Sequence, residues 1–112
     1  MAEAMSDLFE STSVMHASAD WQATSRDVEA VLGSPSFSDG AGWAAWSGFK
    51  LSDEAAGPAW SILAKTRNLA AVIAAAHELG WAVGEPTVGG HETRVPLTAP
   101  SGLSVIAYEP TG

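Results

Sequence analysis

An approximate internal repeat is the sequence feature that most limits the possible folds. The first copy has a short stretch at residues 13–20 and then a helical pattern that ends at Leu32-Gly33. The second copy has a matching stretch at residues 61–68 and a helical pattern that ends at Leu79-Gly80, so the offset is 48 residues and falls to 47 at the glycines. A half of this size cannot bury its own apolar face. The two halves are therefore expected to pair around a common core.

Two segments carry the 3.6-residue periodicity of amphipathic helices. The stronger one, residues 69–79, follows Asn68, a favourable N-cap, and precedes Gly80, which suits the end of a helix. The other covers residues 21–32. Short strand patterns, separated by glycine and proline turns, precede and follow each helix, and Pro96 inside one of them predicts an edge or a bulge. Each half is therefore predicted to be a βαβββ module.

Composition limits the class of protein. A chain of 112 residues that is 46% hydrophobic can form one domain with one core. The absence of cysteine excludes disulfides, thiolate catalysis and cysteine-ligated metals. Thirteen acidic residues against five Lys and Arg give a net charge of -8, which argues against binding to nucleic acid or to an anionic membrane and suits a cationic partner.

The N-terminus, "MAEAMSDLFE", is acidic where a signal peptide has a basic start. No apolar run approaches the roughly 20 residues of a membrane helix. We therefore expect a cytoplasmic protein. Residues 1–7 are expected to be a disordered tail, followed by a single domain at 8–110 with modules at about 8–55 and 58–110.

The second half, "NLAAVIAAAHELGWAVGEPTVGGHETRVPLTAPSGLSVIAYEP", has a helix ending in Leu-Gly, a strand reaching Glu-Pro, a glycine-rich turn and a final hairpin. This order resembles the vicinal oxygen chelate superfamily, which includes glyoxalase I, extradiol dioxygenases and bleomycin-resistance proteins. The first half is similar more loosely, through "SADWQA" and "VEAVLGSP". The resemblance implies an α+β fold in which two βαβββ modules form a concave, partly closed mixed sheet with the helices outside.

The resemblance also implies where a metal would bind. Metal-dependent relatives usually place a ligand at the start of the strand before each helix and a glutamate four residues after the glycine of the last hairpin. The matching positions here hold Ser13, Ser61 and Ile106, with Ser52 in the middle hairpin. None of these is a favoured ligand for a divalent ion. We therefore expect no metal and no other cofactor, as in the non-metal binding branch.

The three histidines do not replace the missing ligands. His77 falls in the last turn of its helix, where an imidazole suits the helix dipole. His16 has the opposite strand parity from Ser13 and is expected to point toward the helix layer. His91 is next to Glu92, but neighbours on a strand point to opposite faces.

The stretch "GWAAWSGF" is predicted to form a tight hairpin that turns at Ser47-Gly48. With a two-residue turn, Trp46 pairs with Phe49 and Trp43 pairs with Ser52, and paired residues share a face of the sheet. The first pair is then expected in the core. Trp43 is expected to face a cleft.

Strand parity, extended from the last hairpin, predicts which side chains line this cleft. If the residue four positions after Gly102 faces the cleft, every second residue along each strand does so as well, and Lys65 is included. The predicted ligand-binding set is Met15, Trp43, Ser52, Ser61, Leu63, Ser104, Ile106 and Tyr108. Apolar surface with a few hydroxyls is typical of small-molecule sites. The alternative is that these faces are core, closed on each other or on a second subunit.

Three functions remain open. The first is a small-molecule-binding protein, similar to the bleomycin-resistance branch, that sequesters a cationic or aromatic antibiotic or metabolite without catalysis. The second is a metal-dependent or metal-free lyase, isomerase or dioxygenase of the same superfamily. The third is a homodimeric structural or interaction module, with Trp60 at the cleft rim or a subunit interface. A ferredoxin-like α+β sandwich is an alternative fold that explains the repeat less well.

Overall fold

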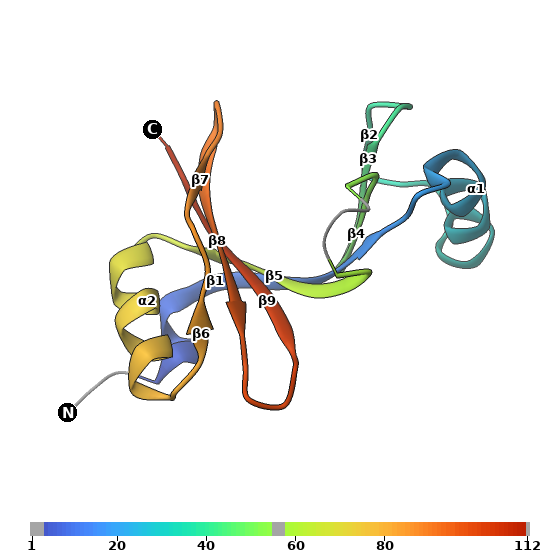
Figure 1. Cartoon of the computed structure of the whole chain (residues 1–112). Helices are drawn as coiled ribbons and strands as arrows, with labels where there is room; N and C mark the ends of the chain where they lie inside the picture. Colours follow the sequence, from blue (N-terminus) through green and yellow to red (C-terminus); the bar gives the residue numbers. More distant parts are fainter. Residues whose placement is uncertain (1–3, 55–57, 112) are drawn as a thin grey trace. The chain divides into compact units, whose positions relative to one another are not determined.

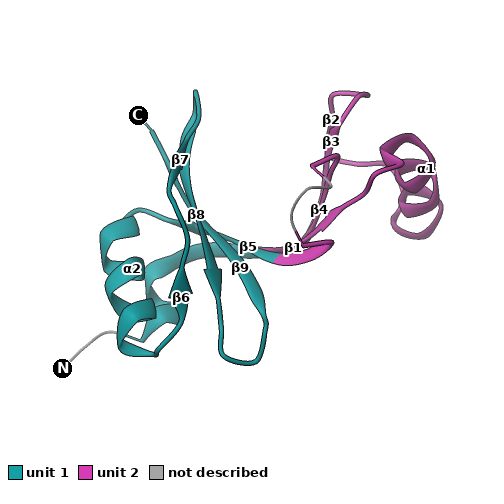
Figure 2. Ribbon diagram, in the orientation of Figure 1, with its two compact units in different colours: residues 1–12, 62–112 teal, residues 13–61 magenta. Residues whose placement is uncertain are grey.

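A computed structural model describes residues 4–54 and 58–111 of the chain. The chain divides into two compact units, shown in Figure 2. Unit 2 is Ser13–Ser61, and unit 1 combines Met1–Thr12 with Ile62–Gly112. Unit 2 is therefore inserted between two parts of unit 1. The described residues combine two α-helices with a mixed sheet, as the predicted α+β class requires (Figure 1).

The described part of unit 2 has one helix and four strands in the sheet order β2-β3-β4-β1. The pairing of β1 with β4 is parallel, and the other two pairings are antiparallel. The elements are β1 (Phe9–Ala17, which begins in unit 1), α1 (Trp21–Leu32), β2 (Phe37–Ser38), β3 (Trp43–Trp46) and β4 (Phe49–Ser52). The described residues thus confirm the βαβββ order of the first half.

The hairpin between β3 and β4 turns at the predicted place. Trp43 pairs with Ser52, and Trp46 pairs with Phe49. Gly48 has a φ of 75°, the left-handed conformation that glycine adopts without steric cost. Trp46 is buried against α1, and its Nε1 donates to the Gly33 carbonyl oxygen at 2.8 Å. The core position of Trp46 was correctly predicted.

Helix α1 covers its side of the sheet from its start as far as Val28, but not at its last turn. The Asp20 side chain caps the helix by accepting from the Ala23 amide, and the buried Trp21 donates from Nε1 to the Leu51 carbonyl oxygen at 3.3 Å. At the other end, Val31 is 82% exposed. The apolar stripe predicted for this helix is real, but Val31 and Leu32 at its end are not covered by the described residues.

Unit 1 has its strands in the order β5-β9-β8-β6, with β7 also paired to β8. The pairing of β5 with β9 is parallel, and β8 is antiparallel to its neighbours. The elements are η1 (Met5–Leu8), β5 (Trp60–Thr66, which begins in unit 2), α2 (Leu69–Glu78), β6 (Ala82–Val83), β7 (Thr87–Val88), β8 (Glu92–Thr98) and β9 (Ser104–Pro110). The second half is a βαβββ module whose first strand after the helix is split into β6 and β7.

A bulge separates β6 from β7 opposite Pro96. Val83 pairs with Leu97 and Thr87 pairs with Arg94, so one side of the ladder carries an extra residue. Pro96 has no amide hydrogen to donate, but its carbonyl oxygen accepts from the Gly84 amide at 2.8 Å. The bulge that was predicted from this proline is present.

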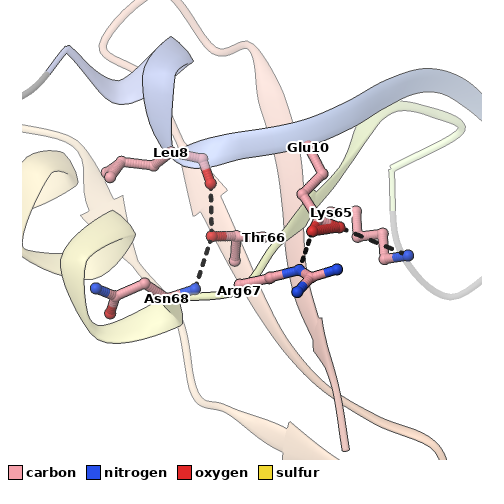
Figure 3. A network of polar contacts seen from close by, with 6 residues as sticks. All are labelled: Leu8, Glu10, Lys65, Thr66, Arg67 and Asn68. Carbon is pink, nitrogen blue, oxygen red and sulfur yellow. Dashed lines mark hydrogen bonds and ion pairs between the residues drawn. The ribbon is translucent and has the colours of Figure 1, made fainter.

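The core of unit 1 lies between α2 and the sheet. It consists of the buried residues Ala64, Val72, Ala76, Val95, Leu97, Val105 and Ala107. At the start of α2, the buried Thr66 donates from Oγ1 to the Leu8 carbonyl oxygen at 2.7 Å and accepts from the Asn68 amide (Figure 3). The Asn68 side chain then caps the helix by accepting from the Ala71 amide at 3.1 Å.

The N-terminal segment differs in part from the expected tail. Residues 1–3 lie outside the described part of the chain, but Met5–Leu8 forms a 3-10 helix. Met5 and Leu8 pack against the unit 1 core, which stabilises this turn. Acidic, polar composition suggested a loose end, and burial of two apolar side chains overrides it.

None of the helices in the described residues is long and apolar enough to cross a membrane.

Candidate functional site

The face of the unit 1 sheet opposite α2 carries polar side chains that the register brings into one row. Val95 and Ala107 lie in the core under α2. Because successive residues of a strand point to opposite faces, the residues before and after each of them in the sequence point away from the helix. Lys65 on β5 is in register with Tyr108 on β9, which is in register with Arg94 on β8. We call these three residues the donor row.

An apolar row lies beside the donor row on the same face. Leu63 on β5 is in register with Ile106 on β9, which is in register with Pro96 on β8. Leu63 is buried, whereas Ile106 and Pro96 are at least partly exposed. The face therefore changes from cationic and phenolic to apolar within one step along the strands.

Two glutamates neutralise part of the donor row. Glu10 lies between Lys65 Nζ, at 3.7 Å, and the guanidinium of Arg67, which it pairs with closely (Figure 3). Glu92 pairs with Arg94 through the arginine Nε. The side chains of Glu10, Lys65, Glu92 and Arg94 are 26% to 38% exposed, whereas Arg67 is 86% exposed. Partial burial leaves these pairs less screened by salt than pairs on an open surface.

Tyr108 on this face has a pKa above its ordinary value. Burial raises the pKa of its phenol, the negative charges of Glu92 and Glu10 raise it further, and Arg94 opposes them. The hydroxyl therefore stays protonated at neutral pH and acts as a hydrogen-bond donor rather than as a base.

A pocket of about 420 Å³ opens in unit 1 at the β1 and β5 end of the donor row. It is lined by Glu10, Lys65, Arg67, Glu109 and Pro110. The Glu109 carboxylate is already bound, since it accepts from the Leu69 amide at 2.7 Å at the start of α2. Among the lining residues, Lys65 and Arg67 have side-chain N–H groups that can donate hydrogen bonds to a ligand in the pocket.

The face of the unit 2 sheet opposite α1 carries the other predicted residues. Met15 is in register with Lys50, and Trp43 and Ala17 are both in register with Ser52. The helix side of the same strands holds Leu51 and Trp46 in the core. Trp43 is half-buried on the helix-free face, while Met15 and Ser52 are buried.

The Asp39 carboxylate fixes the loop that leads into Trp43. Its Oδ1 accepts from the amides of Ala41, Gly42 and Trp43 at 2.9, 2.9 and 3.0 Å. These bonds, that from Gly42 first, lower the pKa of the Asp39 carboxyl. The segment "SDGAGW" carried the signal for this turn, since Asp followed by glycines favours such bonding.

The eight predicted ligand-binding residues divide between the two units. Leu63, Ser104, Ile106 and Tyr108 share the helix-free face of unit 1, and Met15, Trp43 and Ser52 share that of unit 2, while Ser61 is the last residue of unit 2. Met15, Ser52, Ser61 and Leu63 are at most 6% exposed, and the other four are partly exposed.

Sequence reasoning missed Glu10 and Arg94 as members of the unit 1 face. Arg94 carried a usable signal, because it has the same strand parity as Pro96 and pairs with Tyr108 across the hairpin at residues 99–102. Glu10 carried none, since its contact with Lys65 joins residues far apart in the sequence.

The metal site implied by the resemblance does not fit the residues present. The matching positions are Ser13, Ser61 and Ile106, and an isoleucine offers no ligand atom. Over residues 4–54 and 58–111, no three His, Cys, Asp or Glu side chains form a cluster that would hold a metal ion. His16 instead donates from Nδ1 to the Ala59 carbonyl oxygen at 2.7 Å and stacks on Trp60. Its register with the buried Leu51 confirms that it points to the helix side.

Comparison with solved structures identifies the fold. One match, over 90% of this chain and 100% of the other, is the crystal structure of NAD-dependent benzaldehyde dehydrogenase from Legionella pneumophila, with a TM-score of 0.72 and 10% identity. Another is a glyoxalase/bleomycin resistance protein/dioxygenase superfamily member from Vibrio splendidus 12B01, with a TM-score of 0.61 and 10% identity over 88% and 97% of the two chains. The chain has the vicinal oxygen chelate fold. No protein-family model and no curated protein matches the sequence.

Proposed function

We propose that this chain binds a small planar organic molecule, such as an antibiotic or a metabolite, and sequesters it without converting it. The observation that carries the proposal is the pocket of about 420 Å³ beside the helix-free face of unit 1. Small-molecule sites usually have volumes of roughly 300 to 1,000 Å³ and combine apolar surface with a few placed polar groups. The pocket itself is lined mainly by charged side chains, and the adjoining face supplies apolar surface through the apolar row and further donors through the donor row.

The chemistry of the polar groups favours holding a ligand over transforming it. A general base must be deprotonated near neutral pH, but the pKa of Tyr108 is raised and its phenol keeps the proton. The carboxylates of Glu10 and Glu92 are engaged with Lys65, Arg67 and Arg94. The residues at the family's metal positions do not suit a divalent ion, so no metal-activated step is derived.

The test uses the full chain, labelled with nitrogen-15, and a panel of planar aromatic compounds that are anionic, neutral or cationic. A saturable change in the backbone amide signals of β5, β8 and β9 is the expected result. Compounds recovered unchanged after long incubation, with and without nickel, zinc, manganese or iron(II), support sequestration. Conversion of any compound, or thermal stabilisation by one of these metals, favours the enzyme alternative instead. Absence of saturable binding across the panel refutes the proposal.

A second candidate function is self-association, favoured by the surface around Trp60. This side chain is 58% exposed, stacks on His16 with ring centroids 4.1 Å apart, and meets Phe49 edge to face. Val14, in register with Phe49, is also exposed. Aromatic side chains of this kind are enriched at protein interfaces. We propose a cytoplasmic homodimer, with no nucleic-acid or membrane partner, in which this surface is the contact.

Sedimentation equilibrium distinguishes the homodimer from the monomer. The wild-type chain is expected to be dimeric at micromolar concentration, and Trp60→Ser is expected to shift it to the monomer. Phe37→Ser, which removes another exposed aromatic ring of unit 2, is the matched control. A wild-type chain that is monomeric at all concentrations contradicts this second candidate.

A further inference from the structure

The cations of this acidic chain are concentrated on one part of unit 1. The chain has five Lys and Arg in all, and three of them, Lys65, Arg67 and Arg94, belong to the donor row or to the pocket beside it. The net charge of -8 favours a cationic ligand, but a bound ligand meets local charges at short range. With the carboxylates of Glu10, Glu92 and Glu109 beside them, these cations make the local charge balanced, in contrast to the strongly negative chain as a whole.

The donor row has hydrogen-bonding capacity beyond what its two glutamates use. The 3.7 Å between Lys65 Nζ and Glu10 is longer than a hydrogen bond. Arg94 uses Nε for Glu92, which leaves the two terminal nitrogens of its guanidinium. Within residues 4–54 and 58–111, neither these nitrogens nor the Tyr108 hydroxyl makes a hydrogen bond to another side chain.

Tyr108 joins the two cations into one donor surface. Tyr108 is half-buried on β9, and the sheet register places it between Lys65 on β5 and Arg94 on β8. Ile106 precedes it by two residues on the same face, and Pro96 is beside Ile106. A ligand that contacts the donors with one end therefore meets apolar surface with the other.

We propose that the donor row binds the carboxylate of a small aromatic acid, whose ring lies along Ile106 and Pro96. This inference rests on the proposed binding function and specifies the class of ligand. A planar carboxylate matches the fork of an arginine, and charge-assisted bonds of this kind are the stronger ones in proteins. A cationic ligand would instead have to displace Lys65 or Arg94 from its glutamate.

The nearby charges balance before a ligand binds. Lys65, Arg67 and Arg94 lie among the carboxylates of Glu10, Glu92 and Glu109. The ligand carboxylate is therefore held by directed hydrogen bonds from the donor row rather than by a net positive charge.

The test compares benzoate, benzamide and benzylamine, which share a ring and differ in charge. Isothermal titration calorimetry on the full chain is expected to give a dissociation constant for benzoate about tenfold or more below that for benzamide. Arg94→Gln and Lys65→Gln are each expected to remove most of this preference. Arg26→Gln, on the exposed side of α1, changes the net charge equally and is expected to leave benzoate binding unchanged.

The outcomes separate the ligand class from the binding function. Benzoate that binds no tighter than benzamide, or an Arg94→Gln variant that matches Arg26→Gln, overturns the carboxylate proposal. If benzylamine alone binds and shifts the amides of β8 and β9, the binding function stands and the ligand class falls. If none of these three binds while another compound of the aromatic panel does, only the carboxylate proposal falls, and if nothing in the panel binds, both fall. Tyr108→Phe keeps the ring and removes only the hydroxyl, so its amide spectrum is expected to stay unchanged while benzoate binding weakens several-fold. This variant tests the donor row even if a charge variant fails to fold.

Discussion

The two units have the same order of elements but stabilise their helices in different ways. In unit 1, α2 packs on a core of seven buried residues, most of them alanine or valine. In unit 2, the buried cluster under α1 has four residues, and two of them are Trp21 and Trp46. Small interlocking side chains close the first interface, whereas two large rings fill the second.

The two copies of the repeat therefore pack their helices on the sheet with different kinds of side chain. Each indole in unit 2 also donates a hydrogen bond to a backbone carbonyl, Trp21 to Leu51 and Trp46 to Gly33. These bonds tie the helix ends to the hairpin at points that apolar contacts do not cover. Because few residues carry the interface, unit 2 is expected to be the more sensitive to a single change.

The largest expected effect is on unit 2. Trp46→Ala removes a buried ring and the hydrogen bond to Gly33, and it is expected to lower the free energy of unfolding by about 3–5 kcal/mol. Urea denaturation measures the loss, and hydrogen exchange is expected to show faster exchange in α1 and β3 than in α2. Phe37→Ala is the control, since that ring of unit 2 is 57% exposed. Equal losses for both variants would contradict the core role of Trp46.

A smaller effect is expected in unit 1 from Gly84→Ala. A Cβ at this position would lie 2.6 Å from the Pro96 side chain, so the bulge between β6 and β7 must shift. Overpacking of this kind costs about 1–3 kcal/mol, and movement of Pro96 is expected to weaken ligand binding at the apolar row. Gly90→Ala, which meets nothing within 4 Å, is the control. Equal melting temperatures for the two variants would show that the bulge adapts without strain.

The pH dependence of Tyr108 tests the electrostatics of the unit 1 face. This residue is the only tyrosine in the chain, so absorbance at about 295 nm reports it directly. Its pKa is raised above the ordinary value of 10.0, so the folded protein holds the proton more tightly than the unfolded chain. The associated stability is fully present below pH 10.0 and is lost as the pH rises through the folded pKa.

Glu92→Gln sharpens this test. Removing the carboxylate removes a cause of the raised pKa, so the midpoint of the absorbance titration is expected to fall toward that of the unfolded chain. Asp53→Asn, an acid of unit 2, is the control with the same change in net charge. A midpoint that does not respond to Glu92→Gln would remove Glu92 from the causes of the raised pKa of Tyr108 and leave burial and Glu10.

The smallest effect is expected at Asp39 in unit 2. The pKa of its carboxyl is lowered by the three amides it accepts from, so its contribution to stability is present above pH 3.8 and is lost as the pH falls through the folded pKa. Asp39→Asn keeps an acceptor oxygen and is expected to preserve the turn, whereas Asp39→Ala is expected to broaden the Trp43 amide signal. Identical spectra for both variants would remove Asp39 from the positioning of Trp43.

Local signals explain which parts of the fold could be predicted. The register of the β3–β4 hairpin followed from one turn at Ser47-Gly48, and the helix caps Asp20 and Asn68 followed from residue type. Both depend on neighbours in sequence. Periodicity also identified the apolar stripe of α1, but it cannot say what covers a stripe, and the exposed Val31 shows the limit.

The candidate site was predictable to a lesser degree. Parity placed Ile106 and Tyr108 on the helix-free face of unit 1, and Lys65 with them. Parity did not predict that Glu10 belongs to the site, because the contact of Glu10 with Lys65 depends on how β1 is placed beside β5. Nor did it indicate that Met15 and Leu63 would be buried, since the exposure of a face depends on tertiary packing.

The buried hydroxyl of Thr66 has a consequence for synthesis on the ribosome. It joins Leu8 to the start of α2 across 58 residues, so unit 1 needs both ends of the chain. Unit 2 is continuous and is complete once residue 61 has emerged, whereas the N-terminal turn must wait for the last strand to leave the exit tunnel. During that interval the apolar side chains of Met5 and Leu8 are exposed to solvent. A nascent-chain chaperone could therefore bind this segment before the unit 1 core forms and covers it.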